Sequence, residues 1–183
     1  MPGVGFKARL LIHFLRLSKE YKASLITSPI ALLLFVIGFA TPYWVAGSYK
    51  VVVDIEVNSG LWEKCLAGNC FAPSNEDWLD ASRAMACLGL LCAIITVVLA
   101  ALYVCVSRFD KPAVPFAQGA LHLAAALFVL IGDIVFAVHA VDKDIMISWS
   151  IILTMLMIVL EIVSGILVIL HARKSDSGLP SLP

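Results

Sequence analysis

Four long apolar runs, separated by polar loops, dominate the hydrophobic pattern of the chain. Each run is long enough to cross the ~30 Å hydrocarbon core of a bilayer as a helix. The predicted spans cover residues 25–45, 81–106, 116–140 and 147–170. Small residues on the faces of the second and third spans favour tight helix contacts. We therefore predict an all-α membrane protein, a left-handed four-helix bundle forming one domain over residues 25–174.

A smaller, period-two pattern lies in the loop between the first two spans. Over residues 49–57 apolar and polar side chains alternate, as a half-buried strand requires. Turn-forming residues follow at 58–60 and again at 68–69. The pattern predicts a small antiparallel sheet at about residues 46–74, with its apolar face on one end of the bundle.

Composition supports a membrane protein and excludes one class of partner. Hydrophobic residues make up 61% of the chain and charged residues 14%, against about half and about a quarter in a soluble domain. The formal net charge is zero, so nothing indicates nucleic-acid binding. Membrane lipids are the expected surroundings.

The distribution of positive charge predicts the orientation. Lysines and arginines are concentrated in residues 1–24, in the second inter-span loop and just after the fourth span. By the positive-inside rule both termini are cytoplasmic, and the first and third loops are extracellular. We expect a multi-pass plasma-membrane protein with a basic cytoplasmic segment at 1–24 and a disordered tail at 175–183.

The first span has a competing interpretation as a cleaved signal peptide. The basic flank and the Gly38-x-Ala40 pair would permit cleavage. The apolar run, however, continues through Val45, and cleavage would leave three spans in reversed orientation. An uncleaved helix is the preferred interpretation.

The cysteines divide by position. Cys65 and Cys70 lie in the first loop, where an oxidising compartment allows a disulfide. A pair of free thiols and a metal half-site are the alternatives, and the loop contains no histidine to complete a zinc site. We predict a disulfide and no metal or cofactor. Cys105 lies at the inner membrane edge, where palmitoylation and an unmodified packing thiol are equally supported.

Three ionisable residues fall inside the predicted spans: His122, Asp133 and Glu161. Such groups should face the bundle interior with partners. Rise per residue places His122 and Glu161 roughly 9 and 13 Å from the inner end, so they can pair. Asp133 lies nearer the outer end, where Arg83 could reach it. Buried pairs that fix helix register are favoured over a proton or ion path, because the spans show no broken helices and no inverted repeat.

Several motifs together carry a family resemblance. Trp44, the tripeptide Gly60-Leu61-Trp62, and the pair Cys65 and Cys70 resemble the W–GLW–C–C signature of the claudin superfamily. Arg83 sits where claudins place an arginine at the head of the second helix. Residues 75–79 and 164–174 are similar to the corresponding parts of the peripheral myelin and epithelial membrane proteins.

The chain also departs from that pattern. Its two cysteines are closer together than in most claudins, and the first loop is short. The final residues 181–183 do not resemble the PDZ-binding ending of tight-junction claudins. The resemblance therefore implies a divergent member, over about residues 25–174.

The resemblance implies a structural or adhesive membrane protein that organises membrane contacts through its extracellular sheet. Trp62 is expected to anchor that sheet to the bundle. The acids Asp54, Glu56 and Glu63 would give any paracellular path a preference for cations. The alternative is an auxiliary subunit of an ion channel or receptor. Partners are then a second copy, a claudin-like protein or a channel; an enzyme is not expected, because no nucleophile–base set, phosphate loop or metal set occurs.

Overall fold

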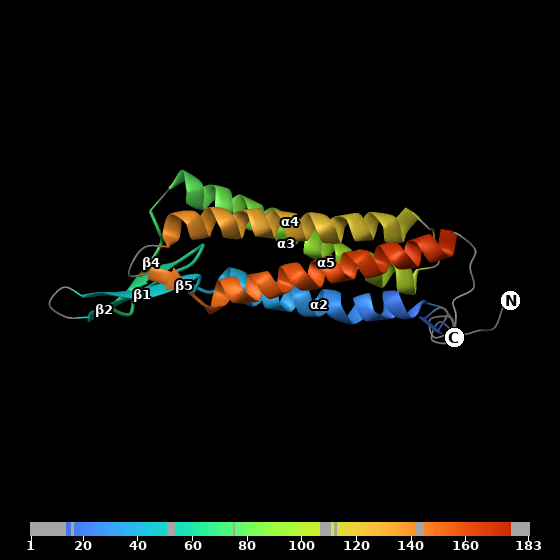
Figure 1. Cartoon of the computed structure of the whole chain (residues 1–183), viewed down its shortest axis with the longest axis horizontal. Coiled ribbons are helices and arrows are strands. Elements are labelled where there is room, and N and C mark those ends of the chain that lie inside the picture. The colour runs from blue at the N-terminus through green and yellow to red at the C-terminus, as the bar shows by residue number, and fades with distance from the viewer. Residues whose placement is uncertain are drawn as a thin grey trace.

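The chain folds into a bundle of four long helices that lie side by side, with a sheet at one end (Figure 1). The computed structural model describes residues 14–15, 17–50, 54–74, 76–106, 111, 113–141 and 145–176. The long helices are α2 (Lys19–Ala40), α3 (Asp77–Cys105), α4 (Ala113–Ala140) and α5 (Trp149–Asp176). Each is long and apolar enough to cross a membrane. The predicted four-helix architecture is confirmed.

Small residues allow the helices to approach closely. The main helix contacts join α3 to α4, α4 to α5, and α5 to α2. A Cβ added to Gly89 of α3 would come within 2.4 Å of the Val129 side chain on α4. A Cβ added to Gly119 of α4 would come within 2.5 Å of Ile169 on α5. These positions keep the backbones close enough for dispersion contacts along the bundle.

The sheet is antiparallel and five-stranded. Its strands are β1 (Val45–Lys50), β2 (Asp54–Ser59), β3 (Lys64–Leu66), β4 (Asn69–Phe71) and β5 (Ile145–Ile147), in the spatial order β4-β3-β2-β1-β5. Val45 and Val57 are buried, and Val45 packs in one cluster with the helix residues Phe35 and Phe136. This burial supplies the apolar floor that an isolated small sheet lacks.

Two predicted boundaries at the start of the sheet were wrong. The first helix ends at Ala40, and Val45 begins β1 instead of ending the span. Because both the end of the helix and the start of the strand are apolar, hydropathy alone does not reveal the boundary between them. The predicted single strand at 49–57 is a hairpin, in which Lys50 pairs with Asp54; residues 51–53 lie outside the described part of the chain.

The third loop also contributes to the sheet, which was not predicted. Residue Ile147, placed in the fourth span from the sequence, belongs to β5, and α5 begins at Trp149. Strand β5 pairs with β1 through Val45↔Ile147 and Gly47↔Ile145. The sheet therefore joins the two loops at this end of the bundle and is not confined to residues 46–74.

Candidate functional site

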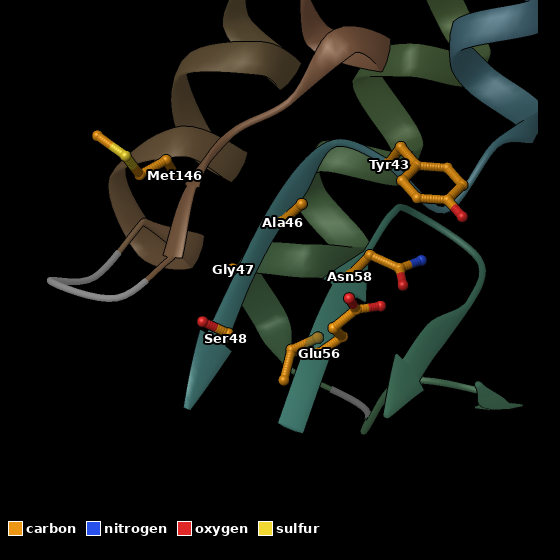
Figure 2. Close-up of a pocket in the computed structure, with 8 residues that line it drawn as sticks. Tyr43, Ala46, Gly47, Ser48, Glu56, Asn58 and Met146 are labelled. Carbon is orange, nitrogen blue, oxygen red and sulfur yellow. The ribbon is translucent and has the colours of Figure 1, made fainter. Parts of the chain in front are cut away.

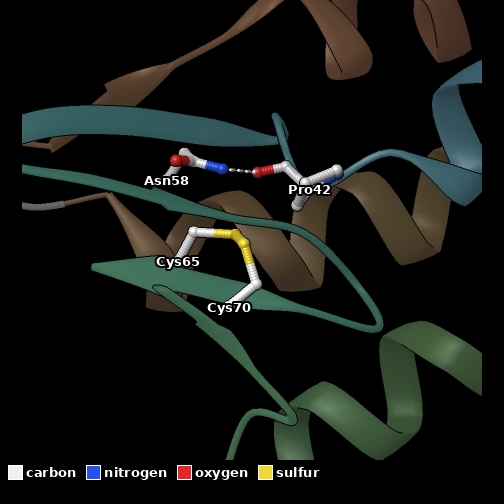
Figure 3. Close-up of a disulfide and its surroundings, with 4 residues drawn as sticks. All are labelled: Pro42, Asn58, Cys65 and Cys70. Carbon is white, nitrogen blue, oxygen red and sulfur yellow. Dashed lines mark hydrogen bonds between the residues drawn. A yellow bond between two sulfur atoms is a disulfide. The ribbon is translucent and has the colours of Figure 1, made fainter. Parts of the chain in front are cut away.

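The disulfide closes the outermost hairpin of the sheet (Figure 3). Cys65 on β3 and Cys70 on β4 are paired residues of the ladder, with 4.0 Å between their Cα atoms, and their sulfurs are bonded. The connecting turn places Ala67 at φ 49° and Gly68 at φ 81°. The predicted disulfide is confirmed. Glu63 Oε lies close to both sulfurs, but bonded sulfurs cannot serve as thiolate metal ligands.

Trp44 lies at the junction of the sheet and the bundle. Its side chain is fully buried, and its ring packs on Phe136 of α4 at 4.9 Å between centroids. The indole Nε1–H donates to the Gly38 carbonyl oxygen at 2.8 Å. A buried Trp needs such an acceptor, and this one is a backbone carbonyl oxygen in the last turn of α2. The contact fixes where β1 leaves the first helix.

Gly60 and Leu61 of the same motif are buried against the end of α2. A Cβ at Gly60 would lie 2.5 Å from the Thr41 carbonyl oxygen and 2.7 Å from the Pro42 Cα, both backbone atoms. Leu61 is fully buried. Nearby, the Asn58 amide donates to the Pro42 carbonyl oxygen at 3.0 Å (Figure 3). Glycine is therefore required at position 60 by close backbone approach.

Arg83 ties this loop to α3. Its Nε–H donates to the Leu61 carbonyl oxygen at 2.8 Å, and its Nη1–H donates to Asp80 Oδ1 at 2.7 Å. Its guanidinium also lies over the Trp62 ring, 5.4 Å from the centroid. The expected contact between Arg83 and Asp133 is therefore wrong: the guanidinium points toward the loop, and a backbone carbonyl takes its main hydrogen bond.

Trp62 is less central than the sequence indicated. Its side chain is 40% exposed and meets Phe39 edge-on at 5.2 Å. Trp44 and Leu61 are the fully buried residues of the motif. Trp62 thus covers Arg83 and the end of α2 from outside, while the other two anchor the sheet.

A second set of contacts joins β5 and the start of α5 to the end of α2. The Ser150 N–H donates to the Tyr43 carbonyl oxygen at 3.1 Å, and the hydroxyls of Ser150 and Thr41 are 2.8 Å apart. The rings of Tyr43 and Trp149 stack at 5.5 Å. Both aromatic side chains remain partly exposed, as is common for residues at a membrane–water interface.

The face of the sheet turned away from the bundle contains a groove of about 450 Å³ (Figure 2). Its floor is the part of β1 formed by the small residues Ala46, Gly47 and Ser48. Its other lining residues are Tyr43, Glu56, Val57, Asn58 and Met146. Ala46 lies between Asn58 and Met146 in the ladder, and Ser48 lies opposite Glu56. Because a short side chain stands between longer ones, the sheet is hollowed along β1.

The predicted acids occupy different parts of the sheet. Glu56 is exposed beside the groove, and Glu63 is exposed next to the disulfide. Asp54 begins β2, but its side chain lies outside the described atoms. The three do not form one described cluster.

Inside the bundle, His122 and Glu161 are brought together. Both are fully buried, and His122 Nδ1 lies 2.6 Å from Glu161 Oε2. His122 Nε2 lies 3.5 Å from Ser28 Oγ, so the pair links α2, α4 and α5. Asp133 is buried separately, where its Oδ2 lies 2.8 Å from the Thr154 hydroxyl oxygen. Cys105 is the exposed last residue of α3.

Three further polar contacts, at the end of the bundle remote from the sheet, were not anticipated. The Tyr21 hydroxyl donates to Gln118 Oε1 at 2.9 Å, and Ser18 Oγ lies 2.9 Å from His171 Nδ1. His171 Nε2 lies 3.4 Å from the Tyr103 hydroxyl. These residues lie near helix ends, where polar side chains are ordinarily assigned to solvent.

The fold and this junction define an integral multi-pass membrane protein with a disulfide-closed sheet at one end of its four helices. The model of the PMP-22/EMP/MP20/Claudin family matches residues 22–168, and the chain belongs to that family. It is 27% identical over 159 residues to the lens fiber membrane intrinsic protein of Rattus norvegicus, covering 82% of this chain and 90% of that protein. The Mus musculus protein of the same name is 28% identical over 142 residues, covering 73% and 80%.

Proposed function

We propose that the protein is a structural and adhesive component of the plasma membrane, whose sheet makes contacts with neighbouring membrane proteins. Family membership supports a structural or junctional role. The observation that carries the proposal is the contrast between the two faces of the sheet. One face is held rigidly through Trp44, Leu61 and Arg83, while the other face presents an open groove beside Met146.

The exposure of Met146 supports a contact role for this face. Its side chain is 72% exposed on β5, an edge strand of the sheet. Flexible, polarizable methionines are common at binding surfaces because they adapt to different partners. A rigid base with an adaptable edge favours association with a second copy or with a related membrane protein.

The orientation is part of the proposal. The basic side chains Lys19, Lys22, Arg173 and Lys174 lie at the ends of α2 and α5 remote from the sheet (Figure 1). The positive-inside rule then favours a cytoplasmic location for that end and an extracellular sheet. Both termini would be cytoplasmic.

Any aqueous path along the sheet is proposed to prefer cations. Glu56 and Glu63 are exposed on the sheet, whereas Asp80 is neutralised by Arg83 and does not add to the excess. Glu56→Lys should lower the permeability ratio of sodium to chloride in an epithelial layer, and Glu56→Gln should lower it less. An unchanged ratio in the charge-reversed layer would reject the path while leaving adhesion open.

A cell-mixing experiment tests the adhesive role. Two differently tagged cell populations expressing the protein should concentrate it where they meet, and not where either meets a non-expressing cell. Met146→Glu should reduce this enrichment severalfold, and Met146→Leu should preserve it because apolar bulk is retained. Uniform distribution of the wild type, together with stable co-purification of a channel or receptor, would instead identify an auxiliary subunit.

A further inference from the structure

Asp133 is a buried acid with no basic partner among the residues that the structure describes. It is 1% exposed and lies about 10 Å below the outer end of α4, counting seven residues to Ala140. Its Oδ2 is 2.8 Å from the Thr154 hydroxyl, while its Oδ1 has no hydrogen-bond partner among the described residues. A carboxylate in this position would carry a full charge in an apolar interior with a single neutral donor.

The other buried acid is supported differently. Glu161 also has one oxygen without a partner, but its Oε2 lies 2.6 Å from His122 Nδ1. A proton between those two atoms leaves the pair without net charge, whichever atom holds it. In the described part of the chain no such base lies beside Asp133, so a proton on the carboxyl group itself is what neutralises it.

The ionisable groups near Asp133 are engaged elsewhere. On α3, Arg83 is bound to Leu61 and Asp80. The other ionisable groups of this helix are Asp77 in its first turn, the thiols of Cys87 and Cys92, and Tyr103 and Cys105 at its far end. On α4 itself, His139 stacks on Trp78. On α5, Glu161 lies two turns from Thr154 and is paired with His122. On α2, none of the residues that follow Lys22 is ionisable.

The hydrogen bonds around Thr154 fit a protonated acid. The Thr154 Oγ1 is 2.8 Å from Asp133 Oδ2 and 2.8 Å from the Ile151 carbonyl oxygen. A threonine hydroxyl has one proton to donate. A carboxyl O–H donating to Thr154 would free that proton for Ile151, and would leave at Oδ1 a neutral carbonyl oxygen, which costs far less to bury than an anion.

We propose that Asp133 is a proton-binding site, which holds α4 against α5 as a neutral carboxylic acid and releases this contact when it loses the proton. The ligand is the proton itself. This inference does not depend on which partner the sheet contacts.

The site is connected to the base of the sheet. Thr154 lies one turn from Ser150, which contacts both Thr41 and the Tyr43 carbonyl oxygen. A Cβ at Gly38 would meet Ser150 and Thr154 together, so the end of α2 packs on the same turn of α5. Displacement of that turn by a charged Asp133 would therefore disturb the residues from which β1 and β5 emerge.

Infrared spectroscopy of the protein in lipid nanodiscs at neutral pH tests the protonation directly. The wild type should show the carbonyl stretch of a carboxylic acid, and Asp133→Asn should lose it. Glu161→Gln serves as the matched control and should retain the Asp133 band. Identical acid bands in the wild type and the Asp133→Asn protein would overturn the proposal.

Unfolding by sodium dodecyl sulfate in mixed micelles tests the energetic consequence. If the folded state holds one more proton than the unfolded state, the ratio of folded to unfolded protein falls about tenfold per pH unit above the titration range of an exposed carboxylate, about pH 4. Asp133→Asn keeps an N–H donor for Thr154 and should lack this slope. The difference isolates Asp133, because every histidine is present in both proteins; equal slopes would contradict the proposal.

Discussion

The Arg83 Nε–H donates to the Leu61 carbonyl oxygen at 2.8 Å, which joins the second membrane helix to the buried centre of the first loop. Arg83→Lys removes the fixed geometry of the guanidinium and cannot reproduce both hydrogen bonds. We expect a loss of about 1.5–3 kcal/mol in the free energy of unfolding, the range for a hydrogen bond to a charged group. Thermal denaturation of the protein in detergent micelles measures this loss.

Asp80→Asn is the matched control for that substitution. It breaks only the ion pair between Arg83 and Asp80. The Asp80 carboxylate is largely exposed, and exposed pairs contribute about 0.2–1 kcal/mol. A larger effect for Asp80→Asn than for Arg83→Lys would mean that the ion pair, and not the bond to Leu61, holds the loop.

Gly60→Ala is expected to prevent normal folding of the loop. The new Cβ would overlap the backbone of Thr41 and Pro42, which cannot move without displacing the end of α2. Such overpacking typically costs about 1–3 kcal/mol, and rigid backbone neighbours place this site at the upper end. Surface delivery and disulfide formation in cells provide the measurement.

Gly68→Ala provides the comparison, since a Cβ at Gly68 meets no atom within 4 Å. Only its left-handed φ of 81° opposes a side chain, at about 1–2 kcal/mol. Equal defects in the two variants would show that turn geometry, and not close packing, explains the glycine of the Gly-Leu-Trp motif.

Removing the disulfide should destabilise the outer hairpin without unfolding the bundle. Cys65→Ser with Cys70→Ser opens a ring of six residues, for which the chain-entropy model gives about 2 kcal/mol. We expect faster proteolysis at residues 63–71 and unchanged helix content by circular dichroism. Cys87→Ser controls for loss of a thiol, because Cys87 is not disulfide-bonded; a similar change in that variant would contradict this prediction.

The buried pair of His122 and Glu161 gives a double-mutant prediction. Glu161→Leu leaves an unpaired histidine in the bundle, and breaking a buried pair in this way costs about 3–5 kcal/mol. Replacing both residues, His122→Leu with Glu161→Leu, should recover most of that stability, since no polar group is then stranded. Normal assembly of Glu161→Gln would show that the charge of Glu161 has no structural role.

The orientation can be tested at the exposed hairpin turn. Ala67→Asn with Asn69→Thr creates an Asn-x-Thr acceptor, and asparagine tolerates the left-handed φ of 49° at position 67. If the sheet is extracellular, the protein should gain an N-glycan removable by a peptide glycosidase. Ala67→Asn alone lacks the acceptor sequence and should remain unmodified. A double mutant that reaches the cell surface without a glycan would contradict the proposed topology.

The sequence was sufficient for the helices and for contacts that depend on depth in the membrane. Long apolar runs identify spans regardless of partners, and rise per residue brought His122 to the level of Glu161. The same reasoning failed for Arg83, because its main partner is the Leu61 carbonyl oxygen. Backbone acceptors exist at every position, so sequence patterns do not reveal which one a side chain will use.

The sheet was harder to predict because its signals overlap those of its neighbours. Alternation continues from β1 into β2, so the hairpin looked like one strand, and Val45 extended the preceding apolar run. Strand β5 has only three residues and adjoins a helix that is itself apolar. Its strand conformation comes from pairing with β1, a contact between residues about a hundred positions apart in the chain.

That pairing has a mechanical consequence. Helix α2 leads into β1, β5 leads into α5, and the two strands are hydrogen-bonded to each other beside the contact of Thr41 with Ser150. A load applied to the sheet is therefore divided between the two membrane helices α2 and α5. To pull α2 or α5 out of the bundle alone, a force must also break the hydrogen bonds between β1 and β5. The sheet therefore transmits force to both helices together.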